Sequence, residues 1–135
     1  MISADLRSLV RQRAGDRCEY CRLTQGTSAL GPLQIEHVVA RQHGGSDDPE
    51  NLALACDRCN LHKGTNLTTL DPESGLVVPL FNPRSDDWAQ HFRIDHGWIV
   101  GLTPVGRGTA RLLNMNAEGR VQLRLEDEDT GEDRD

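Results

Sequence analysis

Two Cys-x-x-Cys pairs are the strongest constraint on how this chain can fold. Cys18 and Cys21 form the first pair, Cys56 and Cys59 form the second, and 34 residues separate the pairs. Two intervening residues allow both sulfurs of a pair to turn toward one ion, and four thiolates complete the tetrahedral coordination that Zn²⁺ adopts. The spacing therefore predicts one structural zinc site, which closes a long loop and leaves no coordination position open.

The alternatives to zinc are two disulfides, four buried thiols or a redox centre. No long apolar run follows a basic start at the N-terminus, so we expect no signal peptide and a cytoplasmic protein, in which thiols stay reduced. Redox chemistry of the thioredoxin type needs only one Cys-x-x-Cys pair. Two matched pairs therefore favour a metal site over disulfides or redox chemistry.

The size and composition of the chain make a metal site valuable. A chain of 135 residues predicts one domain with a modest core. Hydrophobic residues make up 36% and aromatic residues 4%, and so thin a core gains stability from a bound metal. No apolar run approaches the roughly 18 residues of a membrane-spanning helix, so we expect no membrane partner.

The net charge of −6 lies at the C-terminus. Residues 126–135 hold seven acids and one base, so residues 1–125 are neutral overall. We expect this tail to be disordered and solvated, with mimicry of nucleic acid as an alternative role. Acidic proteins repel nucleic acid at long range, but bound divalent ions and a local arginine cluster can reverse the sign at a site.

Periodicity and turn residues predict an α+β fold with three parts. These are a core of residues 1–70, a β-rich, hairpin-rich extension of residues 71–125 packed on the same domain, and the acidic tail of residues 126–135. Trp88, Phe92 and Trp98 are expected to form a small second core in the extension. The expected helices span about residues 4–14, 57–63 and 109–115, the expected strands about 33–40, 51–55, 75–81 and 121–125, with a hairpin over 92–102.

A group of polar side chains between residues 34 and 64 has the chemistry to hydrolyse a phosphodiester. This reaction needs a base that activates water and a hard divalent ion that compensates the charge of the phosphate. His37 can supply the base, and the carboxylate of Glu36 is a suitable oxygen ligand. The amides of Asn51 and Asn60 offer further oxygens. A histidine alone in an apolar strand is more often part of the core, so the prediction depends on these neighbours.

Residues 18–64 resemble an HNH endonuclease. The resemblance rests on three stretches in order, CEYC, IEHVVARQHGGSDDPENLALACDRCN and HKG, and it covers about a third of the chain. It implies a ββα-metal motif, in which two strands and a helix surround a catalytic ion beside a four-cysteine zinc. It makes His37 the general base and Asn51 a support for His37 or its loop.

The same resemblance makes Glu36 and Asn60 ligands of a catalytic Mg²⁺ or Mn²⁺. Glu36 stands where Asp is commoner in the family, and Asn60 stands where other members have His, which favours an oxygen-preferring ion. Side chains alternate along a strand, so Glu36 and His37 can serve one site only if the strand bends or bulges there. Without such a distortion, Glu36 leaves the site and His37 remains.

Four further residues are weaker candidates. His62 lies about 200° around the predicted helix from Asn60, so it would face away and is a minor candidate for a metal ligand. Lys63 shares the face of Asn60, where a phosphate contact and a solvated surface position are equally compatible with the sequence. Arg41 and His43 flank the Gly-Gly loop, where substrate contact competes with simple loop polarity.

The sequence therefore favours a metal-dependent endonuclease with DNA as its substrate. The alternative is a zinc-ribbon module that binds nucleic acid or protein without cutting. A third interpretation is a protein-interaction partner regulated by its acidic tail. His37 and Asn60 separate the first two interpretations, because a pure binding module needs neither. Sequence specificity, the kind of cut and the oligomeric state do not follow from the sequence.

Overall fold

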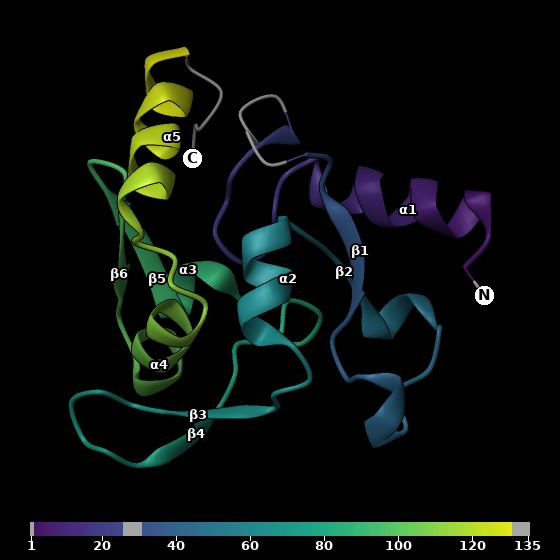
Figure 1. Cartoon of the computed structure of the whole chain (residues 1–135), viewed down its shortest axis with the longest axis horizontal. Coiled ribbons are helices and arrows are strands. Elements are labelled where there is room, and N and C mark those ends of the chain that lie inside the picture. Colours follow the sequence, from purple (N-terminus) through teal and green to yellow (C-terminus); the bar gives the residue numbers. More distant parts are fainter. Residues whose placement is uncertain (1, 26–30, 131–135) are drawn as a thin grey trace.

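The computed structural model describes residues 2–25 and 31–130, which contain five α-helices and three antiparallel two-stranded sheets (Figure 1). This mixture confirms the predicted α+β class. In chain order the elements are α1 Ala4–Ala14, β1 Gln34–His37, the 3₁₀ helices Arg41–His43 and Pro49–Asn51, β2 Leu52–Ala55, α2 Asp57–Lys63, β3 Thr68–Leu70, β4 Val77–Pro79, α3 Trp88–His91, β5 Phe92–Asp95, β6 Trp98–Gly101, α4 Pro104–Leu112 and α5 Glu118–Thr130.

The first helix, α1, begins and ends at the residues that the sequence indicates. The Ser3 hydroxyl accepts a hydrogen bond from a first-turn amide at 3.1 Å, and Gly15 follows the last helical residue. Val10 is fully buried on the inner face. On the same helix, Arg13 donates to the carbonyl of Leu52 at 2.7 Å, which attaches α1 to the start of β2.

The β1–β2 hairpin and α2 form the predicted ββα unit. The strands pair in a regular antiparallel register, with Gln34 opposite Ala55 and His37 opposite Leu52. All four residues of β2 are buried, so this strand lies in the core. Cys56 alone separates β2 from α2 and caps the helix, and α2 packs against β1 at the centre of the molecule (Figure 1).

Aromatic side chains join the C-terminal half to the N-terminal core. Phe81 makes edge contacts with Tyr20 and Phe92, with ring centroids 6.3 and 5.3 Å apart. Trp88 stacks on Phe92 and donates from its indole to the Tyr20 carbonyl at 2.8 Å. The expected second core is therefore part of a single core, and Trp98 does not join it, because 52% of its surface is exposed.

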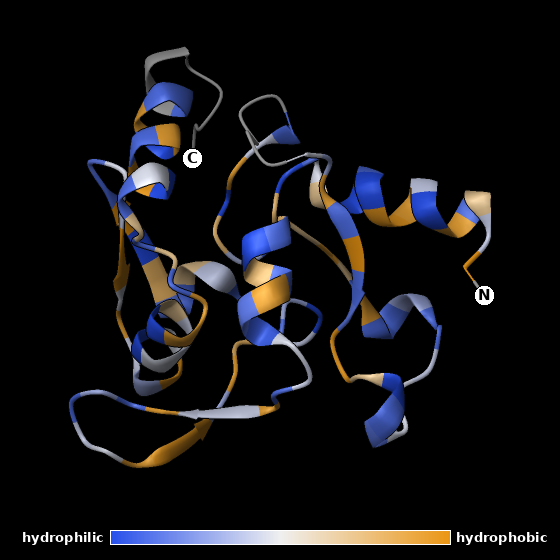
Figure 2. Cartoon of the chain, viewed as in Figure 1, coloured by the Kyte–Doolittle hydropathy of each residue, from blue (hydrophilic) through white to orange (hydrophobic). Residues whose placement is uncertain are grey.

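The hairpin expected over residues 92–102 is present as β5–β6, and the strand expected over 75–81 is shortened to β4, which pairs with β3. Figure 2 shows β4 as a hydrophobic segment, and Leu76 and Val77 on this hairpin are exposed.

The helix expected over 109–115 begins earlier, because Thr103 caps it and Pro104 occupies its first turn. Each described helix is too short or too polar to cross a lipid bilayer.

The expected strand over residues 121–125 is wrong, because these residues belong to α5. This helix continues to Thr130, so it also replaces the first half of the segment that was expected to be disordered. Asp127, in that segment, is fully buried and accepts a hydrogen bond from the Thr24 hydroxyl at 3.1 Å. Residues 26–30, and residues 131–135 of the expected tail, lie outside the described residues. The three-part division of the chain stays a prediction.

A buried ion pair fastens the β3–β4 hairpin to α4. Asp71 is fully buried and accepts two hydrogen bonds from the Arg107 guanidinium, at 2.9 and 3.0 Å. The bonds from Arg107 hold the pKa of this carboxyl well below its usual range. The ionised pair therefore stabilises the fold above the ordinary carboxyl pKa, and this contribution is lost as the pH falls toward the lowered pKa.

We predict that Asp71→Asn lowers the melting temperature at pH 7, and that its difference from the wild type shrinks as the pH falls below about 4. Thermal melts followed by circular dichroism between pH 3 and 7 measure both effects. Glu73→Gln is the matched control, because Glu73 lies 3.5 Å from the same arginine but is 70% exposed. A pH-independent difference between Asp71→Asn and the wild type would contradict the assignment.

Candidate functional site

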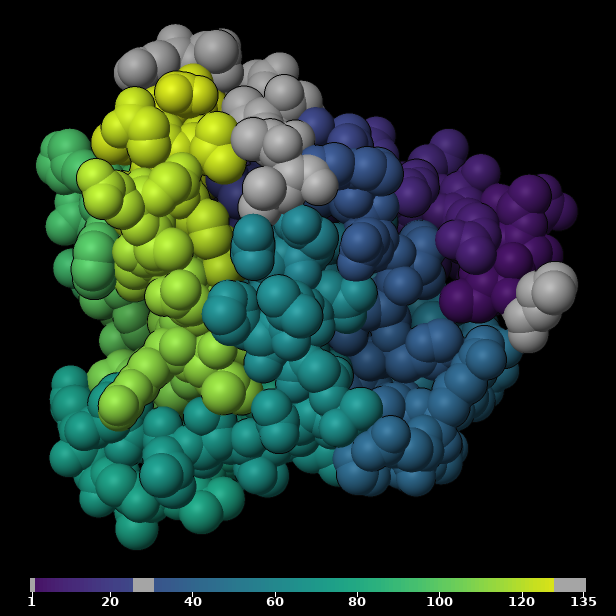
Figure 3. Space-filling view, viewed as in Figure 1, coloured from purple at the N-terminus to yellow at the C-terminus, as the bar shows by residue number. Residues whose placement is uncertain are grey.

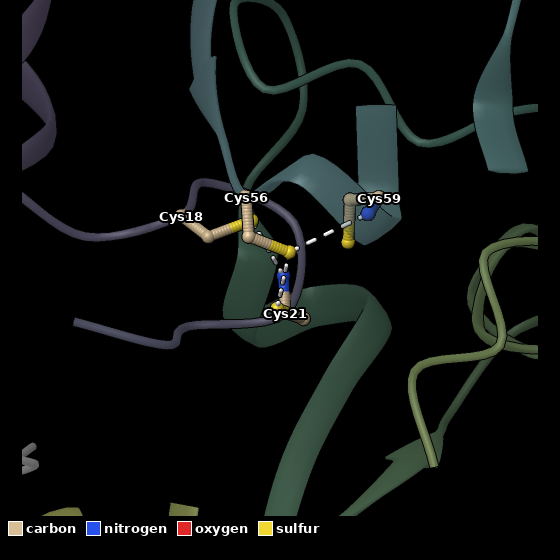
Figure 4. A group of neighbouring side chains, drawn as sticks. All are labelled: Cys18, Cys21, Cys56 and Cys59. Atoms are coloured by element: carbon tan, nitrogen blue, oxygen red, sulfur yellow. Dashed lines mark hydrogen bonds between the residues drawn. The ribbon is translucent and has the colours of Figure 1, made fainter. Parts of the chain in front are cut away.

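Four cysteine sulfurs meet at the junction of the N-terminal segment, β2 and α2. Figure 4 shows the side chains of Cys18, Cys21, Cys56 and Cys59 turned toward a common centre. All four are buried and free of disulfides, and their sulfurs lie within 4.8 Å of one another. This cysteine cluster confirms the predicted metal-binding site and is consistent with structural zinc.

Local hydrogen bonds shape both halves of the cysteine cluster. In each pair the first sulfur accepts from the backbone amide of the second cysteine, at 3.4 Å from Cys21 to Cys18 and at 3.4 Å from Cys59 to Cys56. Burial opposes ionisation of Cys21, but hydrogen bonds from the neighbouring thiols and the charge of Arg120 lower its pKa well below the usual value. A hydrogen bond with Cys18 also lowers the pKa of Cys56, whereas burial raises the pKa of Cys18 and that of Cys59 well above the usual value. The four thiols therefore do not ionise alike before a metal binds.

A second site is an open pocket of about 500 Å³ between the end of β1, the following loop and α2. Its walls include Glu36, His37 and Asn60, so the three main sequence candidates border one cavity. Arg41 stands at the same pocket, with 60% of its side chain exposed. The ββα unit creates this proximity, because His37 ends β1 and Asn60 lies on the helix that packs against that strand.

The imidazole of His37 is hydrogen-bonded to a residue that sequence reasoning missed. Its Nε2 lies 2.7 Å from Oδ1 of Asp47, which also accepts from Arg41 at 2.9 Å. These two bonds hold the pKa of Asp47 well below its usual range, so its carboxylate accepts and does not donate. Nε2 therefore carries the proton, and Nδ1, which has no hydrogen-bond partner in the described part of the chain, keeps its lone pair.

Hydrogen bonds within the β1–β2 loop hold Asp47 next to the His37 imidazole. Asn51 accepts from the Val39 amide at 2.9 Å and donates to the carbonyls of Val39 and Ser46 at 3.0 and 2.8 Å. It thus braces the loop and does not contact the imidazole. Gly45 packs so closely that a Cβ there would lie 1.7 Å from the Val39 carbonyl oxygen, which explains the second glycine of the Gly-Gly pair.

Glu36 is more enclosed than the sequence suggests. It is only 4% exposed, accepts a short hydrogen bond from the Tyr20 hydroxyl, and lies 3.2 Å from the Lys63 ammonium. Burial raises the pKa of Glu36, although Lys63 and Tyr20 act in the opposite direction. β1 pairs regularly, so the bulge that a shared site was expected to require is absent, and the carboxylate of Glu36 and the imidazole of His37 bond to different partners. Glu36 nevertheless borders the same pocket as His37.

Asn60 keeps an amide oxygen available at the pocket. Its Nδ2 donates to the Gln34 side chain at 2.7 Å, and its Oδ1 has no hydrogen-bond partner within the described residues. A carboxylate and an amide oxygen at one cavity are the donors that Mg²⁺ and Mn²⁺ accept, with water in the remaining positions. The Asn60 oxygen therefore suits a hard divalent ion, whereas both carboxylate oxygens of Glu36 already have a partner, Tyr20 for one and Lys63 for the other.

The weaker candidates occupy different environments. Lys63 is 2% exposed and donates to the Val38 carbonyl at 2.9 Å, which differs from both expected roles, a phosphate contact and a solvated lysine. His62 faces away from the pocket, as helix geometry predicted, and lines another cavity beside α5. His43 is exposed and bonds to the Thr65 carbonyl at 3.1 Å.

Residues 18–66 match the family model of the HNH endonuclease. The matched segment contains the cysteine cluster, the ββα unit and the pocket, and it confirms the resemblance seen in the sequence. No curated protein matches the chain. The family match points to a nuclease or another function related to nucleic acid, and it implies nucleic-acid binding in general.

We predict that the purified protein contains about one zinc ion per chain and that Cys56→Ser loses it. Cys56 is the residue to change because it belongs to the cluster, follows β2 directly and caps α2. Elemental analysis together with circular dichroism measures metal content and folding. A wild-type chain that folds without any metal would contradict the assignment.

Proposed function

We propose that this protein is a metal-dependent endonuclease that hydrolyses phosphodiester bonds in DNA. The proposal is carried by one observation, which is that the imidazole of His37 and the oxygen ligands of Glu36 and Asn60 border a single open pocket. A module that only binds nucleic acid has no need of this combination. The HNH match over the same residues supports it.

In this mechanism His37 is the general base. Asp47 Oδ1 accepts a hydrogen bond from Nε2 of His37 at 2.7 Å, so the lone pair of Nδ1 can take a proton from a water molecule in the pocket. The carboxylate of Asp47 also stabilises the imidazolium that results. Asp47 acts through His37, so it is a positioning residue, and Asn51 supports both by fixing the loop.

Glu36 and Asn60 would hold the catalytic Mg²⁺ or Mn²⁺. Such an ion supplies Lewis-acid chemistry, because it offsets the charge that develops on the phosphate. Tyr20 and Lys63 each bond one oxygen of the Glu36 carboxylate, so the ion would bind the remaining lone pairs of these oxygens. Arg41, at the rim of the pocket, provides a positive charge that can contact a DNA phosphate.

One observation favours a second candidate function, a non-catalytic zinc-ribbon module that binds nucleic acid. The buried Lys63 ammonium lies 3.2 Å from Glu36, so this carboxylate has a counter-charge without any divalent ion. A binding module would retain the cysteine cluster and Arg41 but would not cleave. Activity that depends on His37 distinguishes the two functions.

We predict that the wild-type protein nicks supercoiled plasmid DNA with Mg²⁺ or Mn²⁺, and that His37→Ala lowers the rate by about 10²- to 10⁴-fold. Gel electrophoresis of timed samples measures the rate. Binding of the same DNA is expected to survive the substitution, because His37 serves the chemical step. Equal rates for the two proteins would remove His37 as the base, and a wild type that binds without nicking would support the binding module.

We also predict that Asp47→Asn lowers kcat about tenfold or more, but less than His37→Ala, with KM for DNA little changed. The asparagine amide can present either its oxygen or its nitrogen to Nε2, so the tautomer of His37 is no longer fixed. Asp48→Asn is the matched control, because it removes the same charge from the same loop at an exposed residue. Equal losses in the two variants would show that loop charge, and not the bond to His37, is responsible.

A further inference from the structure

α5 covers the cysteine cluster with charged side chains. Arg120 and Arg124 lie one turn apart on its inner face and are 5% and 0% exposed. Figure 3 shows α5 beside α2, the helix that carries Cys59. Fully buried arginines are rare unless an opposite charge or several acceptors surround them. The groups beneath this face of α5 must therefore carry negative charge or accept hydrogen bonds.

Arg120 contacts the sulfurs directly. Its Nη2 lies 2.8 Å from Sγ of Cys59 and 3.8 Å from Sγ of Cys56. Its Nη1 donates to the carbonyls of Leu113 and Asn114 at 2.7 and 2.8 Å, which directs the guanidinium toward the sulfurs. This geometry places a fixed, charged donor against a sulfur that is a thiolate whenever it holds a metal.

Arg124 holds the other side of the cysteine cluster through the backbone. It donates to the carbonyl of Cys21 at 3.3 Å and to that of Gly97, in the β5–β6 turn, at 2.7 Å. The turn packs so closely on α5 that a Cβ at Gly97 would lie 2.7 Å from the Val121 carbonyl oxygen. Arg124 therefore joins the first Cys-x-x-Cys pair, α5 and the C-terminal hairpin.

The charges of the two arginines match those of a loaded metal site. Four thiolates around Zn²⁺ carry a net charge of about −2, and an anion of this size is costly to bury without compensation. Arg120 and Arg124 place two positive charges beside it. Without the ion, nothing bonds the four sulfurs to one centre, so the sulfurs that Arg120 contacts would no longer be held in place beneath α5.

We propose that Arg120 and Arg124 complete the metal site, and that α5 docks on the cysteine cluster only while the cluster holds its ion. The metal then controls whether the C-terminal helix is attached. Thermodynamic linkage makes the effect reciprocal, so a docked α5 tightens metal binding by the same factor by which the metal tightens docking. The inference concerns the cysteine cluster, so it does not depend on the proposed cleavage of DNA.

The first test measures zinc affinity by competition with a chromophoric chelator. Arg120→Met, which removes the charge but keeps most of the side-chain volume, is expected to weaken zinc binding by about 10- to 100-fold. Arg58→Met is the matched control, because Arg58 is an exposed arginine on α2 next to Cys59. Wild-type affinity in Arg120→Met, or an equal loss in Arg58→Met, would overturn the proposal.

The second test needs no variant, so it applies even if Arg120→Met fails to fold. Hydrogen–deuterium exchange of the full chain is followed with zinc bound and after removal by a chelator. The amides of α5 are expected to lose protection on metal removal to a larger extent than those of α1 and of β5–β6. Unchanged protection of α5, or an equal loss over all these elements, would contradict metal-dependent docking.

Discussion

The convergence of four cysteine sulfurs sets the geometry of the ββα unit. Cys56 follows the last residue of β2 and caps α2, so a metal there would fix the angle at which the helix leaves the strand. Asn60 follows Cys59 directly along α2, and the same angle brings it to the pocket that His37 borders. A shift of the metal site would therefore be transmitted to the pocket within one helical turn.

The interior of this protein relies on matched charges to an unusual extent. Lys63 pairs with Glu36 beneath the pocket, and Arg107 of α4 pairs with Asp71. In addition, α5 presents two arginines to the cysteine cluster. Buried ions are unfavourable unless their partners are well placed, but they specify one arrangement strongly once they are. This explains how a chain with 4% aromatic residues can hold three small hairpins together.

The pocket and the cysteine cluster share α2 but face different sides of it. Asn60 lies toward His37, whereas His62 lies toward α5 and Arg120. The same short helix thus links the proposed reaction centre on one side to the proposed docking site of α5 on the other. The seven residues of α2 include Cys59 of the cysteine cluster, Asn60 of the pocket and the buried Lys63. A movement of the cluster would therefore also move the pocket.

Features that depend on local spacing could be predicted without the structure: the two cysteine pairs, the cap of α1, the ββα order and the β5–β6 turn. The contacts among polar groups could not, because Asp47, Lys63 and Glu36 meet their partners through the fold and not at a fixed sequence interval. The alternation in residues 121–125 predicted a strand on the assumption that the apolar side chains are the buried ones. In the structure the buried side chains in this part of α5 are instead two arginines. Arg120 and Arg124 are buried because they face the cysteine cluster, where a bound metal and its thiolates would carry negative charge.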